Sequence, residues 1–207
     1  MYKNNSAILF KTVFLSLLTL TSILVQAQQQ SEQYAPSATQ LATSTDVISG
    51  SRTIDLVDKQ GNRFVIGRVV FSPEGNGYGY QLTLDHHQFT DHFLSMKEMK
   101  CLEGAELWCH IPFPYPNPHT VSRDDLRWLE HDLLFLFKRH NEFGANFWNG
   151  IYYRLSVEEG RLVGEAQAID LNILASPADD LTVPPVGEFD REEADLEKRW
   201  LPRLEIY

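Results

Sequence analysis

The sequence predicts a mainly β fold, a single antiparallel β-meander domain that forms a small barrel or a curled sheet. Three observations predict it: short runs in which apolar and polar residues alternate, tight turns rich in glycine and asparagine between those runs, and only two short helical stretches. Many short strands joined in chain order by tight turns are typical of such folds. We expect one short helix near the middle of the domain and one near the C-terminus.

The first strands are predicted from two turn patterns. The extended runs 53–58 and 63–71 flank residues 59–62, where Gly61 and Asn62 tolerate the positive φ that hairpin loops require. A second turn at residues 74–77 leads into an alternating run, residues 78–84, with one apolar and one polar face.

The last hairpin has the clearest alternation. Ile151, Tyr153 and Leu155 recur at every second position, and a turn at residues 158–160 leads into the run 162–174. Because successive side chains of a strand point to opposite faces, we expect these three residues to face the core and their neighbours to face away from it.

The middle of the chain is less regular. Residues 107–115 alternate, but the prolines at 112, 114, 116 and 118 remove backbone donors, which predicts an edge strand or a polyproline-like segment. The apolar run 133–137 predicts a buried strand, and a helix through the same residues also fits.

The two helices are predicted from caps and charges. Thr120 or Ser122 would cap a short helical turn through Asp124 and Asp125, because acidic residues suit a helix N-terminus. The charged stretch 190–198 predicts the second helix, which ends before Pro202 because proline cannot continue a helix.

The first residues have the pattern of a cleavable signal peptide. Lys3 and Lys11 precede an uncharged apolar run, residues 12–25, which is shorter than the roughly 20 residues that cross a bilayer, and Ala27 offers a small residue for cleavage. We therefore expect residues 1–27 to be a signal peptide, residues 28–50 a disordered polar linker and residues 51–207 the β-rich domain. The product would be periplasmic or secreted, without a membrane span after processing; a retained membrane anchor is the alternative.

Charge and cysteine content limit the possible partners. The formal net charge is −10, and removal of the lysine-containing leader makes it more negative, so phosphate backbones are repelled and nucleic-acid binding is disfavoured. An isolated pair, Cys101 and Cys109, predicts a disulfide in an oxidising compartment. A zinc half-site or a redox pair is the alternative, but the spacing is not that of a Cys-x-x-Cys motif.

Seven short stretches resemble a group of exported bacterial proteins that has no assigned activity. They lie between residues 67 and 206 and read KCLEG with LWCH and PFPYPNP, LEHDLLF, WNGIYYRL, DLNILASP and WLPRL. The resemblance agrees with export and implies no catalytic residue, cofactor or fold.

Metal binding is one hypothesis for the function. His86, His87 and His92 lie close together with two aspartates, and imidazole with carboxylate suits zinc or copper. If the segment is extended, alternation separates these side chains, so His110, His119 and His131 would have to contribute from elsewhere. The alternative to a metal site is an ordinary polar loop at the end of the strand 78–84.

Hydrolytic chemistry has less support in the sequence. There is no G-x-S-x-G elbow, no H-E-x-x-H helix and no glycine-rich phosphate loop. The pair Glu130 and Asp132 is expected to be exposed, solvating charge. We therefore expect a protein that is not an enzyme and has no cofactor.

The aromatic residues give the remaining signal. Trp108, Trp148, Tyr152 and Arg154 could line a cleft, because Trp and Tyr combine apolar faces with a polar group. The sequence thus favours an exported β domain that binds a small apolar or amphipathic molecule, or another envelope protein, through the last hairpin. A metal-binding protein or metal-dependent enzyme, and a purely structural envelope component, are the alternatives.

Overall fold

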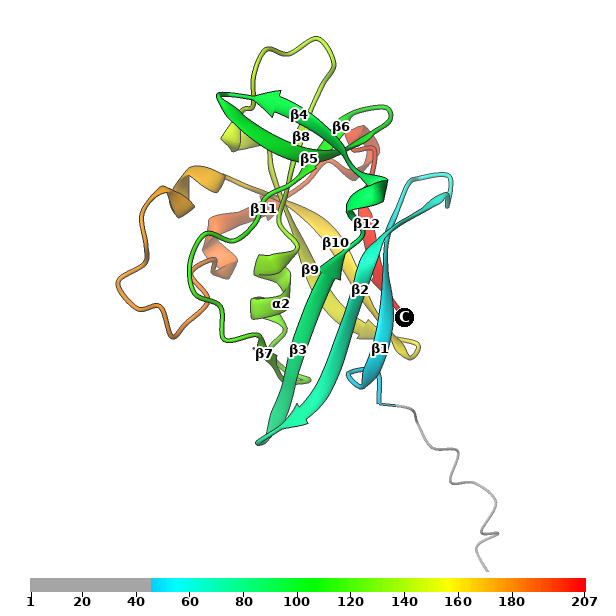
Figure 1. Ribbon diagram of the computed structural model, residues 1–207, viewed down its shortest axis with the longest axis vertical. Coiled ribbons are helices and arrows are strands. Elements are labelled where there is room, and N and C mark those ends of the chain that lie inside the picture. Colours follow the sequence, from blue (N-terminus) through cyan, green and yellow to red (C-terminus); the bar gives the residue numbers. More distant parts are fainter. Residues whose placement is uncertain (1–45) are drawn as a thin grey trace, which may run out of the picture. The chain divides into compact units, whose positions relative to one another are not determined.

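The computed structural model describes residues 46–207, which belong to the second of the two compact units into which the chain divides. The predicted signal peptide, residues 1–27, and the predicted linker up to residue 45 lie outside the described residues. Within the described part, twelve strands form one antiparallel sheet (Figure 1). The strands are β1 Gly50–Val57, β2 Arg63–Glu74, β3 Gly77–Leu84, β4 Thr90–Leu94, β5 Lys97–Glu103, β6 Leu107–His110, β7 Thr120–Val121, β8 Phe135–Lys138, β9 Gly150–Glu158, β10 Arg161–Ile169, β11 Arg191–Glu193 and β12 Arg203–Ile206.

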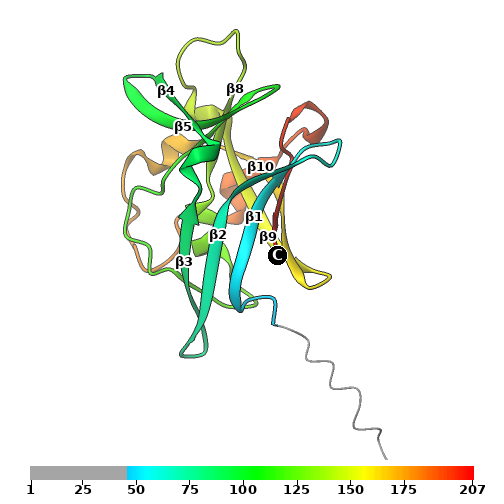
Figure 2. The same cartoon turned by 45° about the vertical axis from the view of Figure 1, so that its right-hand side comes forward.

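The sheet is curled but not closed. Its strand order is β4-β5-β6-β8-β9-β10-β12-β1-β2-β3-β7, with β11 attached to β10, and the two end strands β4 and β7 do not pair with each other among the described residues (Figures 1 and 2). The mainly antiparallel β class is therefore confirmed, and a closed barrel is not formed. The C-terminal strand β12 lies between β10 and β1, so it joins the last hairpin to the first.

The three predicted hairpins are present. β1 pairs with β2, β2 with β3, and β9 with β10. Each turn contains a glycine in the left-handed region, Gly61 at φ +84°, Gly75 at φ +56° and Gly160 at φ +80°. A side chain is strained in that conformation, so these glycines allow the tight turns.

The helical predictions need correction. A short helix does lie in the middle of the chain, but α2 is Arg127–Asp132; Ser122 and Asp125 form a hydrogen-bonded turn before it. No helix spans 190–198 in the described chain: Arg191–Glu193 pairs with β10 as β11, and Leu196–Lys198 is a single 3₁₀ turn. An isolated short helix is costly to nucleate, whereas the edge of β10 offers β11 hydrogen-bond partners directly.

Of the two alternatives predicted for residues 107–115, an edge strand and a polyproline-like segment, the edge strand is wrong. β6 is not an edge strand, because it lies between β5 and β8, and it ends at His110 before Pro112. The prolines thus end the strand. The apolar run 133–137 does contribute to a buried strand, β8.

The main core fills the concave side of the sheet. Its largest fully buried side chains include Trp108 and Tyr153, and Trp108 Nε1 donates to the Tyr153 hydroxyl at 3.1 Å. Val47 and Ile48 are buried in the same core, so the folded domain begins before the predicted linker boundary at residue 50. Their apolar side chains explain this, because burying them stabilises an ordered start.

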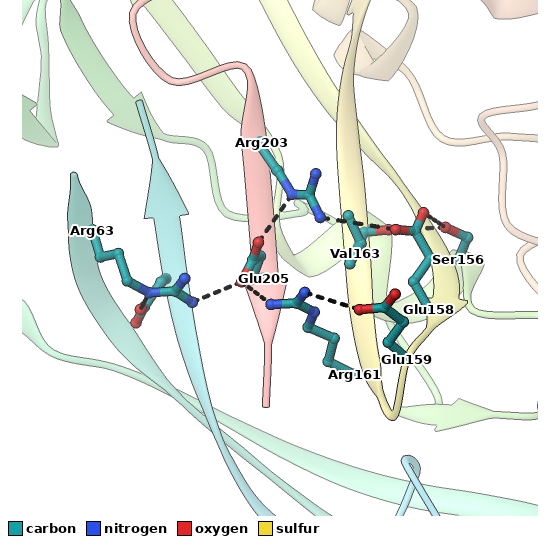
Figure 3. Close-up of polar contacts among 9 residues, drawn as sticks. Arg63, Ser156, Glu158, Glu159, Arg161, Val163, Arg203 and Glu205 are labelled. Carbon is teal, nitrogen blue, oxygen red and sulfur yellow. Dashed lines mark hydrogen bonds and ion pairs between the residues drawn. The ribbon is translucent and has the colours of Figure 1, made fainter. Parts of the chain in front are cut away.

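The outer face of the sheet carries a charged network around Glu205. Arg63, Arg161 and Arg203 come from three strands, and a guanidinium nitrogen of each lies 2.8–3.0 Å from a Glu205 carboxylate oxygen (Figure 3). Arg63 Nε also donates to the buried Asp55 at 2.7 Å. These contacts connect β12 to β1, β2 and β10.

The predicted disulfide is confirmed. Cys101 on β5 and Cys109 on β6 are directly opposite each other, with an Sγ–Sγ distance of 2.01 Å. Among the helices described for residues 46–207, none has the length and apolar character needed to cross a bilayer.

Candidate functional site

The four residues predicted to bind a ligand do not share one accessible surface. Trp108 and Tyr152 are fully buried, whereas Trp148 is 71% exposed and Arg154 is also exposed. The strand around Tyr152 is covered on both faces, because a second apolar cluster with Leu171, Leu174 and Val186 packs on the side opposite Ile151 and Tyr153. The prediction of a free aromatic face on the last hairpin is therefore wrong.

The histidine segment does not form a metal site in the described structure. His86 and His87 lie in the 3₁₀ turn His86–Gln88, and His92 lies on β4 with its Nε2 2.8 Å from Glu103 Oε1. Within residues 46–207, no three His, Cys, Asp or Glu side chains converge in a way that could hold a metal ion. A turn followed by strand alternation separates the three imidazoles.

A cleft lies at the open side of the sheet, beside β3. It consists of two adjoining cavities, of about 210 Å³ and 480 Å³. Four residues line both cavities, namely Leu84, His86, His110 and Pro112. We call these two adjoining cavities together the seam cleft.

The smaller cavity is mainly apolar on its inner walls. Its apolar lining comes from four separate segments and includes Phe89, Met99, Ile111 and Phe147. Lys97, Glu98 and Lys100 of β5 also line it, and Lys100 pairs with Asp91 at 2.5 Å. This end of the seam cleft can hold an apolar group and has charged side chains near it.

The larger cavity has a polar part that is formed by Tyr80, His119 and Asp132. Tyr80 donates its hydroxyl hydrogen to Asp132 Oδ2 at 2.8 Å and accepts a hydrogen bond from Asn117 Nδ2 at 3.1 Å. His119 Nε2 lies 3.4 Å from the same Asp132 oxygen. Burial raises the pKa of Asp132 despite the hydrogen bond from Tyr80, because the charged form is poorly solvated there.

His119 has an unusual backbone. Its φ is +52°, and three hydrogen bonds around it fix the chain: His119 N–H donates to Asn117 Oδ1, the His119 carbonyl accepts from Tyr80 N–H, and Asn117 Nδ2 donates to the Trp128 carbonyl. Histidine adopts the left-handed region more often than most residues, but at a cost in energy. The half-exposed imidazole of His119 makes an edge-to-face contact with the Tyr80 ring, with ring centroids 5.3 Å apart.

The neighbouring histidines are held neutral by burial. His110 Nε2 lies 2.9 Å from the Asp132 carbonyl, and burial lowers its pKa, with a further lowering from His86. His131 lies outside the seam cleft: Nδ1–H donates to the Arg127 carbonyl, and Nε2 accepts from Val186 N–H. Burial lowers the pKa of His131 to about 4, so it is a neutral structural residue at pH 7.

The carboxylate pair of the sequence is not exposed as expected. Glu130 is buried and accepts from the Tyr152 hydroxyl and from Leu155 N–H at 2.6 Å. Burial raises the pKa of Glu130. Because two residues of an α-helix differ by about 200° in direction, α2 directs Glu130 toward β9 and Asp132 toward the seam cleft.

Sequence reasoning considered His110 and His119 but could not place them, and it missed Tyr80, Pro112 and Phe113. The feature of the sequence that could have indicated the cleft is the closeness of the stretches LWCH and PFPYPNP in the chain. These two stretches contain or adjoin His110, Pro112, Phe113, Asn117 and His119, and the stretch LEHDLLF contains Asp132.

The chain matches no protein-family model, no curated protein and no solved structure. The chemistry of the seam cleft is therefore the basis for inferring function. An apolar cavity that adjoins a cavity with hydrogen-bonding groups is typical of a site that binds a small ligand.

Proposed function

We propose that this chain is an exported, non-enzymatic binding protein whose seam cleft holds a ligand with an apolar part and a hydrogen-bonding part. The apolar part occupies the cavity beside Met99 and Ile111, and the polar part lies beside His119 and Asp132. This replaces the last hairpin as the proposed binding surface.

The observation that carries the proposal is that the two cavities adjoin and share four lining residues, Leu84, His86, His110 and Pro112. A ligand that spans both cavities would gain from burial of its apolar surface and from hydrogen bonds to Asp132 and the imidazoles. The polar groups at one end, fixed by mutual hydrogen bonds, would set its orientation.

Export is supported by the leader pattern of residues 1–27 and by the disulfide between Cys101 and Cys109. Disulfides persist in oxidising compartments, which agrees with a periplasmic or secreted protein. Intact-mass measurement of the exported chain tests this part, with a start near Gln28 expected. A product that retains Met1 would contradict it.

Blocking the shared middle of the seam cleft tests the binding proposal. His86 is exposed and lines both cavities, so His86→Trp should fill the cleft without disturbing the core. His87, the next residue, is also exposed and lines neither cavity, which makes His87→Trp a matched control.

The probe is anilinonaphthalene sulfonate, a small amphipathic dye whose fluorescence rises in apolar surroundings. We expect the wild type and His87→Trp to have equal Kd values and His86→Trp to bind about tenfold more weakly, which corresponds to about 1.4 kcal/mol. Thermal melts confirm that both variants are folded. Equal binding by His86→Trp and the wild type would show that the dye does not occupy the cleft, and would refute the proposal.

A further inference from the structure

One wall of the seam cleft is the free edge of strand β3. Beyond Gly79, no described strand pairs with β3 on the side away from β2, because β7 pairs only with Tyr78 and Gly79. Tyr80, Gln81, Leu82 and Leu84 line the larger cavity along this edge.

The hydrogen bonds of β3 show which main-chain groups face the cleft. Tyr80 N–H donates away from β2, to the His119 carbonyl at 2.8 Å. Main-chain groups alternate in direction along a strand of an antiparallel pair, so the N–H and C=O groups of Leu82 and Leu84 also point away from β2, while those of Gln81 and Thr83 point toward it. Within residues 46–207, no backbone or side-chain hydrogen bond uses the N–H of Leu82 or Leu84.

The side-chain environment changes along the same edge. Tyr80 and Leu82 line only the larger, polar cavity. Leu84 lines both this cavity and the smaller, apolar cavity. A strand laid beside β3 would send every second side chain inward, with consecutive inward positions close to 7 Å apart. One such side chain would enter the polar cavity, and the next would enter the apolar one.

We propose that the ligand of the seam cleft is an extended peptide segment that adds a strand to the free edge of β3. It would carry a cationic side chain beside Asp132 and, two residues away, an apolar side chain in the cavity beside Met99. This inference rests on the proposed binding function of the cleft and specifies its ligand class.

Two further observations favour this occupant. An added strand would continue the line of β7, which already pairs with β3 through Thr120 and Val121. The formal charge of the chain is −10, and Asp132 is a carboxylate inside the cleft, so a cationic side chain is complementary to it. In strand addition, main-chain bonds supply affinity and alternate side chains supply specificity.

Amide hydrogen exchange, followed by NMR on the disulfide-bonded protein, reads the edge directly. The probe is a short synthetic peptide with lysine and phenylalanine two positions apart and threonine or valine between and around them. We expect the amides of Leu82 and Leu84 to exchange fast in the free protein and at least tenfold more slowly with peptide. The amides of Gln81 and Thr83 serve as internal controls, since they bond to β2 and are already protected.

Two methylated forms of the peptide test the main-chain contacts. One carries N-methyl groups on the odd backbone nitrogens and the other on the even ones, so only one of them loses the donors that face β3. We expect their Kd values to differ by tenfold or more. Equal Kd values, or peptide binding without slower exchange at Leu82 and Leu84, would overturn the inference.

The dye experiment separates the two levels of failure. If His86→Trp blocks dye binding but no peptide binds, the cleft is a binding site for small amphipathic molecules and strand addition is wrong. If His86→Trp leaves both dye and peptide binding unchanged, the proposed function of the cleft fails as well.

Discussion

The two polar regions of the sheet are built in opposite ways. On the outer face, the Glu205 carboxylate is contacted by three guanidinium groups and is only 5% exposed. In the seam cleft, Asp132 faces a half-exposed His119, and both lie beside an open cavity of about 480 Å³.

The pKa values reflect this difference. Burial favours the protonated form of Glu205, but the hydrogen bond from Arg63 and the charges of the three arginines lower its pKa below the ordinary value. Burial raises the pKa of Asp132. The groups that lower this pKa are the neutral side chains of Tyr80 and Asn117 and the half-exposed His119, and they do not offset the effect of burial. In the outer network, the three arginines thus neutralise the charge of Glu205. In the cleft, a cationic group of a ligand could neutralise the charge of Asp132 in the same way.

The largest expected effect is the loss of the Glu205 carboxylate. Glu205→Ala removes the carboxylate that joins Arg63, Arg161 and Arg203, and the loss of hydrogen bonds between charged groups typically costs about 3 kcal/mol. Chemical denaturation measures this cost. Glu158→Ala is the control, because Glu158 is exposed and lies 3.8 Å from Arg203, and it should change stability by less than about 0.5 kcal/mol. Similar losses for both variants would show that the outer network is not a stability element.

The next largest effect concerns the disulfide, which braces the cleft side of the sheet. Cys101 and Cys109 join β5 to β6, and β5 carries four of the residues that line the smaller cavity, Lys97, Glu98, Met99 and Lys100. The chain-entropy model gives about 2.5 kcal/mol for so short a loop. We expect the double variant Cys101→Ala, Cys109→Ala to lower the free energy of unfolding by about this amount and to weaken dye binding. A fold that is destabilised without any change in dye affinity would mean that the cleft does not depend on this brace.

Local patterns in the sequence were sufficient for the hairpins and the disulfide, and insufficient for the cleft. Gly61, Gly75 and Gly160 mark turns through a property of the residue itself, so the hairpins follow directly. The cleft depends on the sheet staying open beside β3, and on Asp132 meeting Tyr80 across a separation of 52 residues. No local period encodes such long-range contacts.

The same limit explains the error at Tyr152. Strand alternation correctly placed Tyr152 opposite Ile151 and Tyr153, but it cannot show that a later segment, with Leu171 and Val186, covers that opposite face. It also cannot show that α2 brings Glu130 within hydrogen-bond distance of the Tyr152 hydroxyl.

As pH falls, protonation of Glu205 and protonation of Asp132 should change the free energy of unfolding in opposite directions. The folded-state pKa of Glu205 is lowered, so its contribution is fully present above its unfolded pKa of about 4.5 and is lost as pH falls through the folded value. The pKa of Asp132 is raised, so the folded protein binds that proton more tightly and its charge penalty is relieved as pH falls. Unfolding free energies measured between about pH 7 and pH 3 should therefore fall less steeply for Glu205→Gln than for the wild type. They should fall more steeply for Asp132→Asn, and parallel curves for the three proteins would contradict the contrast between the regions.

The smallest expected effect on stability is that of Asp132→Asn itself at pH 7. The amide oxygen can still accept the Tyr80 hydroxyl hydrogen, and the variant removes a carboxylate that burial penalises, so stability should change by less than about 1 kcal/mol and can increase. Binding should respond in the other direction: the lysine-containing peptide should lose tenfold or more in affinity, because its cation then faces no carboxylate. A peptide with norleucine in place of lysine has no charge to lose and should bind the variant and the wild type equally. If Asp132→Asn instead unfolds the domain as severely as Glu205→Ala, then Asp132 is a structural residue, and the polar end of the seam cleft resembles the outer network more closely than its geometry indicates.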